Sequence, residues 1–322
     1  MYGIVRRIVR VLPTRRTHET LGDSLFRVFS GGVALGLLAL LGLILLVLIE
    51  GAAASIGAFG SGFLIGGVWH PRPPEQFGAL PFLGGTLETS AIALLLGVPV
   101  SLGVAIFLSE LSPTWLRVPL TFLVELLAAV PSVVYGLWGV FVLIPLMRDH
   151  VEPVLQGGLG WLPLFQGTPL GYDKLTAGVI LAVMIIPTVS SVARESLRAV
   201  PQSQREAAYA LGATRWETTR RVVLSYARSG LFGAVILGLG RAFGETMAVT
   251  MTIGNRNAFT VSLLDPGQTI ASWIANNFNE AGPLELSALI ELGLVLLLIS
   301  LLINLFARLM LYQVYHVREG RP

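Results

Sequence analysis

The chain has 322 residues, of which 54% are hydrophobic and only 13% are charged; its mean hydropathy is +0.74 and its formal net charge is +3. A soluble domain carries about 25% charged residues, so this composition excludes a soluble globular protein and indicates a polytopic membrane protein. There is no cysteine, and the single lysine, Lys174, is not preceded by glycine, so the chain can form neither a disulfide nor a Walker A loop. Another chain must bind any ATP that drives this protein.

Six apolar runs are each long enough to cross a bilayer. The first, residues 31–49, follows a basic segment at residues 1–30 and exceeds the ~7–15 residue core of a signal peptide. We therefore expect a retained membrane helix, with a cleaved signal peptide as the alternative. An external loop rich in glycine and proline is predicted at residues 50–85. The other spans are predicted at residues 86–108, 119–146, 175–193, 230–253 and 284–307. We expect kinks at Pro99 and Pro131, the latter breaking the third span, and Pro187 lies inside the fourth.

The arginines predict the orientation of these spans. With the N-terminus inside, the inner segments hold six, one, seven and three arginines in chain order, whereas the outer loops hold only four basic residues. Inner loops of membrane proteins carry an excess of lysine and arginine. We therefore expect six spans with both the N- and C-termini in the cytoplasm.

A basic segment between the fourth and fifth spans predicts two locally specified helices. Ser203 and Glu206 have the spacing of a capping box, and so do Thr214 and Glu217. Gly212 lies between them, where a residue in the left-handed conformation would end the first helix. A DNA-binding helix-turn-helix is the alternative, but helices tethered at both ends by membrane spans could hardly lie in a major groove. We expect no nucleic-acid partner and a helical pair that docks onto a cytoplasmic ATPase.

The fifth span carries charge near its middle. Arg241 lies at a depth where an arginine costs roughly 2.5–3.5 kcal/mol on insertion scales. Glu245 follows at i+4 on the same face, and Gly240 and Gly244 form a GxxxG pattern that lets another helix approach closely. An internal ion pair is one interpretation; a solute site or gate is the other, because the planar fork of arginine matches phosphate oxygens in pairs. The candidate substrate-pathway residues are Arg241, Glu245, Thr246 and Glu125.

The basic segment resembles the EAA loop of ABC importer permeases. Glu206-Ala207-Ala208 and the following Gly212 match the pattern, although Ser225 stands where the pattern has proline. In that family the loop inserts into the ATPase subunit and carries its closure to the membrane. The ATPase-coupling residues implied by this resemblance are Glu206, Ala207, Ala208, Gly212 and Arg215.

The fifth span resembles a more specific group. The run Gly240–Met251, GRAFGETMAVTM, is similar to the signature of phosphate ABC importer permeases. Phe77–Pro81 and Pro131–Trp138 are similar to the PstC-type subunit rather than to its partner PstA. The resemblance covers the chain from about Leu21 onward. It implies an all-α membrane protein with the type I ABC importer permease (MetI-like) fold, a permease core at residues 86–311 that contains the EAA loop at 194–229, and a cytoplasmic tail at 312–322.

The resemblance also implies a function: the permease subunit of an ATP-driven importer of inorganic phosphate in the bacterial cytoplasmic (inner) membrane. Its implied partners are a PstA-like second permease, a PstB-like ATPase dimer and a PstS-like extracytoplasmic phosphate-binding protein, besides the lipid bilayer. The residues alone indicate only an anion, so a permease for sulfate or molybdate, or a secondary anion transporter, stays open; inverted repeats typical of the latter are not visible. No cofactor, metal site or catalytic residue is expected, because the four histidines are isolated and no GxSxG or HExxH motif occurs.

Overall fold

A computed structural model describes residues 21–319; predictions about the arginines of residues 1–20 lie outside the described residues. The chain divides into two units, residues 1–50 and 51–322. The boundary falls within α2 (Leu21–Phe59), a helix without interruption. In the described part, six helical segments are long and apolar enough to cross a membrane: Leu25–Phe59, Leu80–Leu111, Ser132–Leu159, Lys174–Arg198, Arg215–Gly244 and Pro283–Leu309. The prediction of an all-α membrane protein with six spans is confirmed.

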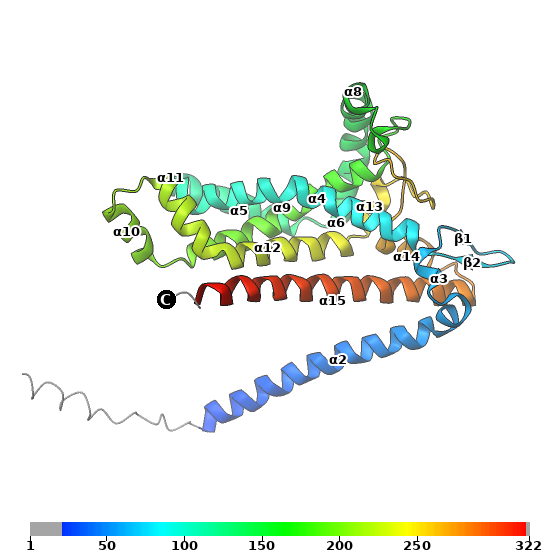
Figure 1. Cartoon of the computed structure of the whole chain (residues 1–322), viewed down its shortest axis with the longest axis horizontal. Helices are drawn as coiled ribbons and strands as arrows, with labels where there is room; N and C mark the ends of the chain where they lie inside the picture. Colours follow the sequence, from blue (N-terminus) through cyan, green and yellow to red (C-terminus); the bar gives the residue numbers. More distant parts are fainter. Residues whose placement is uncertain (1–20, 320–322) are drawn as a thin grey trace, which may run out of the picture. The chain divides into compact units, whose positions relative to one another are not determined.

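Three helices form the centre of the second unit. They are α4 (Leu80–Ile106), α9 (Lys174–Arg198) and α12 (Leu224–Gly244), and α9 packs against both of the others (Figure 1). Small residues bring their backbones together. A Cβ added at Gly178 would lie 2.6 Å from Ile92, and one added at Gly238 would lie 2.5 Å from Val189, so neither position admits a side chain. Close backbone approach at glycine is the ordinary packing mode between membrane helices.

The third predicted span is split at Pro131. Helix α5 (Thr114–Ala129) ends before it, because a proline forces the preceding residue out of the helical region, and Val130 is extended. Helix α6 (Ser132–Trp138) starts directly afterwards. The helix then runs on through η2 (Gly139–Leu143), α7 (Ile144–Leu146), η3 (Met147–Val151) and α8 (Glu152–Leu159). The predicted kink is confirmed, but the expected end of the span at residue 146 is wrong, because π-helical turns carry the chain past the charged Arg148 and Asp149.

The predicted external loop at residues 50–85 contains short helical and strand segments, and the first helix extends into it. Helix α2 continues to Phe59, α3 (Gly62–Ile65) follows, and β1 (Trp69–His70) pairs antiparallel with β2 (Gln76–Phe77) before α4 begins. Apolar burial explains these segments: the Trp69 ring packs against Phe77, Phe82 and Trp273. Its Nε1 donates to Glu285 Oε1 at 2.9 Å, so the predicted external loop meets the start of the predicted sixth span.

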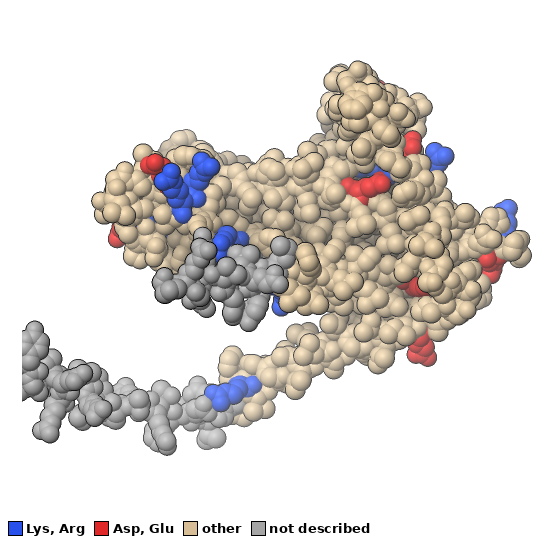
Figure 2. Space-filling view, in the orientation of Figure 1, with Lys and Arg blue, Asp and Glu red and all other residues tan. Residues whose placement is uncertain are grey.

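The fifth predicted span also differs from expectation. Helix α10 (Gln202–Ala210), α11 (Arg215–Glu217) and η5 (Thr218–Val223) lead directly into α12, so helical structure starts well before residue 230. The span ends at Gly244 instead of Ile253, and α13 (Met247–Thr252) is a separate helix. Arginine side chains gather at the end that holds α10 and α11 (Figure 2).

The remaining elements complete the chain. The segment η1 (Phe107–Leu111) extends α4. The others are η4 (Pro163–Phe165), α14 (Ile270–Asn277) and α15 (Pro283–Glu319). Helix α15 packs against α12 and α14, and α13 packs against α6, η2 and α9. The two halves of the predicted fifth span therefore share α9 as a neighbour, but α12 also packs against α4 and α15, whereas α13 also packs against α6 and η2.

Candidate functional site

The helical pair formed by α10 and α11 confirms two of the three local features that the sequence predicts, the turn at Gly212 and the capping box at Thr214. Gly212 has φ +83°, in the left-handed region that glycine adopts without strain, and its N–H donates to Tyr209 O. Thr214 and Glu217 form a complete capping box. The predicted box at Ser203 is wrong: α10 begins at Gln202, two positions before the start that a cap at Ser203 would give, and no side chain caps it. Proline at position 201 sets the entry to the helix, and it leaves Ser203 inside the first turn.

The coupling residues implied by the resemblance lie on an open surface. Glu206, Ala207, Gly212 and Arg215 are exposed, whereas Ala208 is buried against the rest of the pair. Leu211, beside Gly212, is 90% exposed. A pocket of about 500 Å³ lies beside these residues and is lined by Gln204, Ala207, Ala208, Leu211, Gly212, Ala213, Glu217, Arg221 and Val222. An apolar side chain so exposed at a helix end, next to a pocket, is a surface suited to a protein partner.

Arg241 lies in the last turn of α12, half-buried, and its Nη1 donates to Thr188 Oγ1 on α9 at 3.2 Å. Its Nε is buried and has no acceptor among residues 21–319. No carboxylate of the described chain forms an ion pair with it. The interpretation as an internal ion pair with Glu245 is therefore wrong within this chain. A guanidinium has five donors, and most of them remain available to a ligand.

The break after Gly244 explains why the expected i+4 pair does not form. Glu245 has extended backbone (ψ 125°), so it is not on the helical face of Arg241. Its Oε1 accepts a hydrogen bond from the N–H of Ala248 at 3.3 Å, at the start of α13. Thr246 Oγ1 donates back to Gly244 O at 3.4 Å. Arg241, Glu245 and Thr246 thus flank one interruption in a membrane helix, the kind of position where transporters expose polar groups.

The GxxxG pattern and Glu125 have other surroundings than expected. No other described element comes within 4 Å of a Cβ at Gly240 or Gly244, so the close helix contact predicted there is absent from the described chain. Glu125 on α5 accepts a hydrogen bond from Arg194 Nη2 at 3.1 Å. The structure does not bring Glu125 to Arg241, and its place on the substrate pathway stays a prediction.

Three long-range ion pairs were missed, and the contact of Arg194 with Glu125 described above is one of them. Lys174, at the start of α9, pairs with Glu88 on α4 at 2.6 Å. Arg205, on α10, pairs with Glu110 at 2.9 Å. The sequence shows these residues only as isolated charges beside apolar runs, and no local spacing relates the partners. Within residues 21–319, no group of three or more histidine, aspartate or glutamate side chains is placed to hold a metal ion.

A buried carboxyl pair lies at the opposite end of α9 from the helical pair. Asp173 caps α9 by accepting from the N–H of Thr176 at 2.7 Å, and Glu152 accepts from the N–H of Gly171 at 3.2 Å. Both side chains are fully buried, and the second oxygen of each has no hydrogen-bond donor in the described part of the chain. Burial, with Glu152 nearby, raises the pKa of Asp173 to about 8.

Comparison with known proteins extends these observations. The family model described as "Binding-protein-dependent transport system inner membrane component" matches residues 97–314. The phosphate transport system permease protein PstC of Haemophilus influenzae is 48% identical over 298 residues, covering 91% of this chain and 94% of the relative. Its namesakes from Pasteurella multocida (44% identical, covering 96% and 97%) and Xylella fastidiosa strain Temecula1 (45% identical, covering 95% and 95%) are also similar.

Solved structures agree on the fold. A chain of a bacterial alginate ABC transporter, in complex with an alginate-bound periplasmic protein, superposes with a TM-score of 0.60 at 16% identity, covering 92% of this chain and 98% of that chain. A chain of the inward-facing MetNI methionine ABC transporter gives a TM-score of 0.54 at 19% identity, covering 73% and 96%. Six apolar segments, an EAA-type helical pair and these relatives lead to one assignment: the chain belongs to the family of binding-protein-dependent transport system inner membrane components, among the PstC permeases.

Proposed function

We propose that the chain is the permease subunit of an ATP-driven importer of inorganic phosphate and forms half of its translocation pathway. The observation that carries the proposal is Arg241. Its guanidinium lies at a break in a membrane helix, with a buried Nε that has no acceptor and with no carboxylate partner in the described chain. An uncompensated charge in a membrane span is costly, and it marks a substrate or ion pathway more often than a packing contact.

The chemistry of arginine favours an oxyanion at this position. Its planar fork donates paired hydrogen bonds that match two oxygens of a phosphate, and it stays charged when desolvated. The hydrogen bond to Thr188 occupies one donor and orients the group. The named relatives are phosphate transport system permeases, which supports phosphate as the anion. Glu245 and Thr246 would complete the polar surroundings on the far side of the break.

The family supplies the partners. A binding-protein-dependent transport system joins this membrane component to a substrate-binding protein and an ATPase. We assign Glu206, Ala207, Ala208, Gly212 and Arg215 to docking of a PstB-like ATPase dimer, a PstA-like subunit to the other half of the pathway, and a PstS-like protein to delivery of phosphate. The open faces of Gly240 and Gly244, which no described element covers, suit close approach by the second permease.

The arrangement of the loops supports the proposed topology. Arg205 and Glu110 lie on segments predicted to be inside, and they touch; Trp69 and Glu285 belong to segments at the opposite end, and they touch as well. Together with the excess of arginine in the inner segments, these contacts support the topology that we propose, with α10 and both termini on the cytoplasmic side of a bacterial cytoplasmic membrane.

Reconstitution tests the function directly. The chain is assembled with its second permease and ATPase subunits in proteoliposomes, the phosphate-binding protein is added outside, and uptake of radiolabelled phosphate is followed with ATP inside. We expect uptake that requires ATP and the binding protein, and that excess sulfate or molybdate does not inhibit. Uptake driven by an ion gradient without the ATPase would identify a secondary transporter, and inhibition by sulfate or molybdate would identify a different oxyanion permease.

A further inference from the structure

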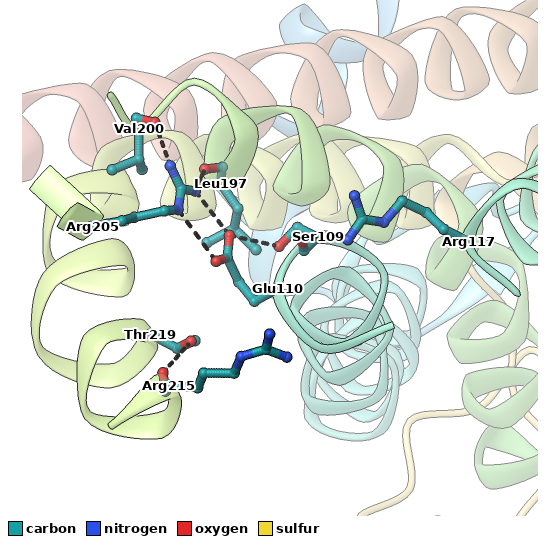
Figure 3. Close-up of polar contacts among 8 residues, drawn as sticks. All are labelled: Ser109, Glu110, Arg117, Leu197, Val200, Arg205, Arg215 and Thr219. Carbon is teal, nitrogen blue, oxygen red and sulfur yellow. Dashed lines mark hydrogen bonds and ion pairs between the residues drawn. The ribbon is translucent and has the colours of Figure 1, made fainter. Parts of the chain in front are cut away.

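One arginine of the helical pair reaches out of it to another part of the molecule (Figure 3). Arg205, on α10, donates from Nη2 to Glu110 Oε1 at 2.9 Å and from Nε to Glu110 Oε2 at 3.3 Å. The two side chains are only 13% and 11% exposed. A two-point contact of this kind fixes the relative orientation of the two groups as well as their distance.

The same guanidinium also holds the end of α9. Its Nη2 donates to Leu197 O at 2.9 Å, and its Nη1 donates to Val200 O. Leu197 lies in the last turn of α9, and Val200 follows that helix. Leu197 O also accepts from the N–H of Val200 at 3.3 Å, so Arg205 adds a second donor at the helix end and supplies a donor to the carbonyl of Val200. One side chain therefore joins α10 to α9 and to the end of α4.

Glu110 is itself firmly placed. It belongs to η1 (Phe107–Leu111), which continues α4 without a break. The Ser109 hydroxyl donates to Glu110 Oε1 at 3.2 Å, and Arg117 on α5 donates to the carbonyl oxygens of Ser109 and Ser112 at 3.4 and 3.2 Å. Figure 3 shows Arg117 approaching this turn from the side opposite Arg205. The carboxylate is thus a fixed point on the α4–α5 connection.

Helix α10 otherwise packs chiefly against η5, the segment that leads into α12. The polar link to the end of α4 is made by Arg205, which is directly beside the exposed Glu206 and Ala207. We propose that Arg205 is a positioning residue for transport: its contact with Glu110 makes α4 and α9 follow α10 when the ATPase pulls on the helical pair. This inference rests on the proposed function.

The alternative is that the pair only supports the local fold. Removing one partner of a nearly buried ion pair destabilises a protein in any case. A test must therefore restore the mechanical link without restoring the charges. The chain offers a direct way, because it contains no cysteine.

The experiment uses the assembled complex in proteoliposomes, with the double variant Arg205→Cys/Glu110→Cys. A bifunctional methanethiosulfonate joins the two thiols and is later cleaved by a reductant. The readout is phosphate taken up per ATP hydrolysed. We expect this ratio to fall about tenfold in the unlinked variant, the range of a typical coupling between sites. Linking should return the ratio to near the wild-type value, and cleavage should lower it again.

Three controls fix the interpretation. Each single cysteine variant treated with the reagent should stay uncoupled. Arg198→Gln removes an exposed ion pair in the same region, in which Arg198 Nη1 lies 3.9 Å from Glu195 Oε1. This variant should keep the wild-type ratio of phosphate taken up to ATP hydrolysed. Co-purification of the ATPase subunits reports whether the complex still assembles.

The outcomes separate the two proposals. A wild-type ratio in the unlinked double variant, or loss of bound ATPase that linking does not repair, overturns the positioning role. If the wild-type complex itself takes up no phosphate with ATP, the proposed function fails and this inference fails with it. ATP-driven uptake in the wild type, with no effect of linking or cleavage in the variant, overturns this inference alone.

Discussion

Replacing Arg241 tests whether a passing anion uses the charge at the helix break. In Arg241→Ala the chain loses one hydrogen bond, from Nη1 to Thr188, and no ion pair within the described residues. It also loses an uncompensated charge in a membrane span, which relieves a cost of about 2.5–3.5 kcal/mol. We therefore expect the variant to assemble with its partners as well as the wild type does.

The expected effect on transport is much larger. A fork that binds two phosphate oxygens makes two charge-assisted hydrogen bonds, each contributing about 1.5–3 kcal/mol. Their loss amounts to about 3–6 kcal/mol, or roughly a 10²–10⁴-fold drop in uptake at low phosphate. Arg241→Lys keeps the charge but loses the fork, so about one bond of that pair, or a 10–10²-fold drop, is expected.

The assay is the initial rate of ATP-driven phosphate uptake into proteoliposomes across a range of phosphate concentrations. Rates are normalised to the amount of assembled complex, measured by co-purification of the ATPase. A value of kcat/KM within twofold of wild type for Arg241→Ala would refute the reasoning, as would an Arg241→Lys variant no better than Arg241→Ala.

Three further predictions concern other parts of the chain. Thr188→Val keeps the shape but frees Arg241 from its anchor, so the KM for phosphate should rise about 2–10-fold with kcat retained; an unchanged KM would show that the hydrogen bond orients nothing. Gly212→Val forces a β-branched residue to φ +83°, at roughly 1–3 kcal/mol of backbone strain although no atom obstructs its Cβ. Gly212→Val should therefore weaken co-purification of the ATPase, whereas Gly212→Asn should not. Equal co-purification with the two variants would contradict a role of this turn in docking. Because the pKa of Asp173 is raised to about 8, the folded chain keeps a proton that the unfolded chain releases from about pH 4. The contribution of Asp173 to the free energy of unfolding is therefore complete below about pH 4. It is lost as the pH rises to about 8, by up to ~1.4 kcal/mol per pH unit. Asp173→Asn should flatten the fall in melting temperature between about pH 5 and about pH 8, and parallel curves for variant and wild type would exclude the effect.

The features that local chemistry specifies could be predicted from the sequence. The left-handed turn at Gly212 and the capping box at Thr214 depend on residues within one or two turns of each other, and so does the kink at Pro131. Ser203 shows the limit of this approach. Its spacing to Glu206 is correct for a capping box, but the helix begins directly after Pro201. Each signal alone predicts a helix start, and the sequence does not show which of the two determines it.

The candidate site could be predicted only in part. The depth and chemistry of Arg241 pointed to a pathway, but its expected partner Glu245 depends on helical continuity that the structure lacks. The run from residue 230 to 253 is apolar throughout apart from these charges, so hydropathy cannot show where the helix stops. Pairs such as Arg205 with Glu110 join residues 95 positions apart, and only the packed bundle determines which charges meet.

The uninterrupted helical run from Arg215 to Gly244 has a mechanical consequence. Its 30 residues correspond to a rod of about 45 Å. A tilt or rotation applied at the Thr214 cap is therefore carried stiffly along the rod to Arg241. Past Glu245 the chain forms α13, which packs chiefly against α6, a helix outside the rod. An anion bound at this break would contact the end of the rod on one side and α13 on the other, so a small rotation of the rod relative to α13 would be enough to weaken its binding.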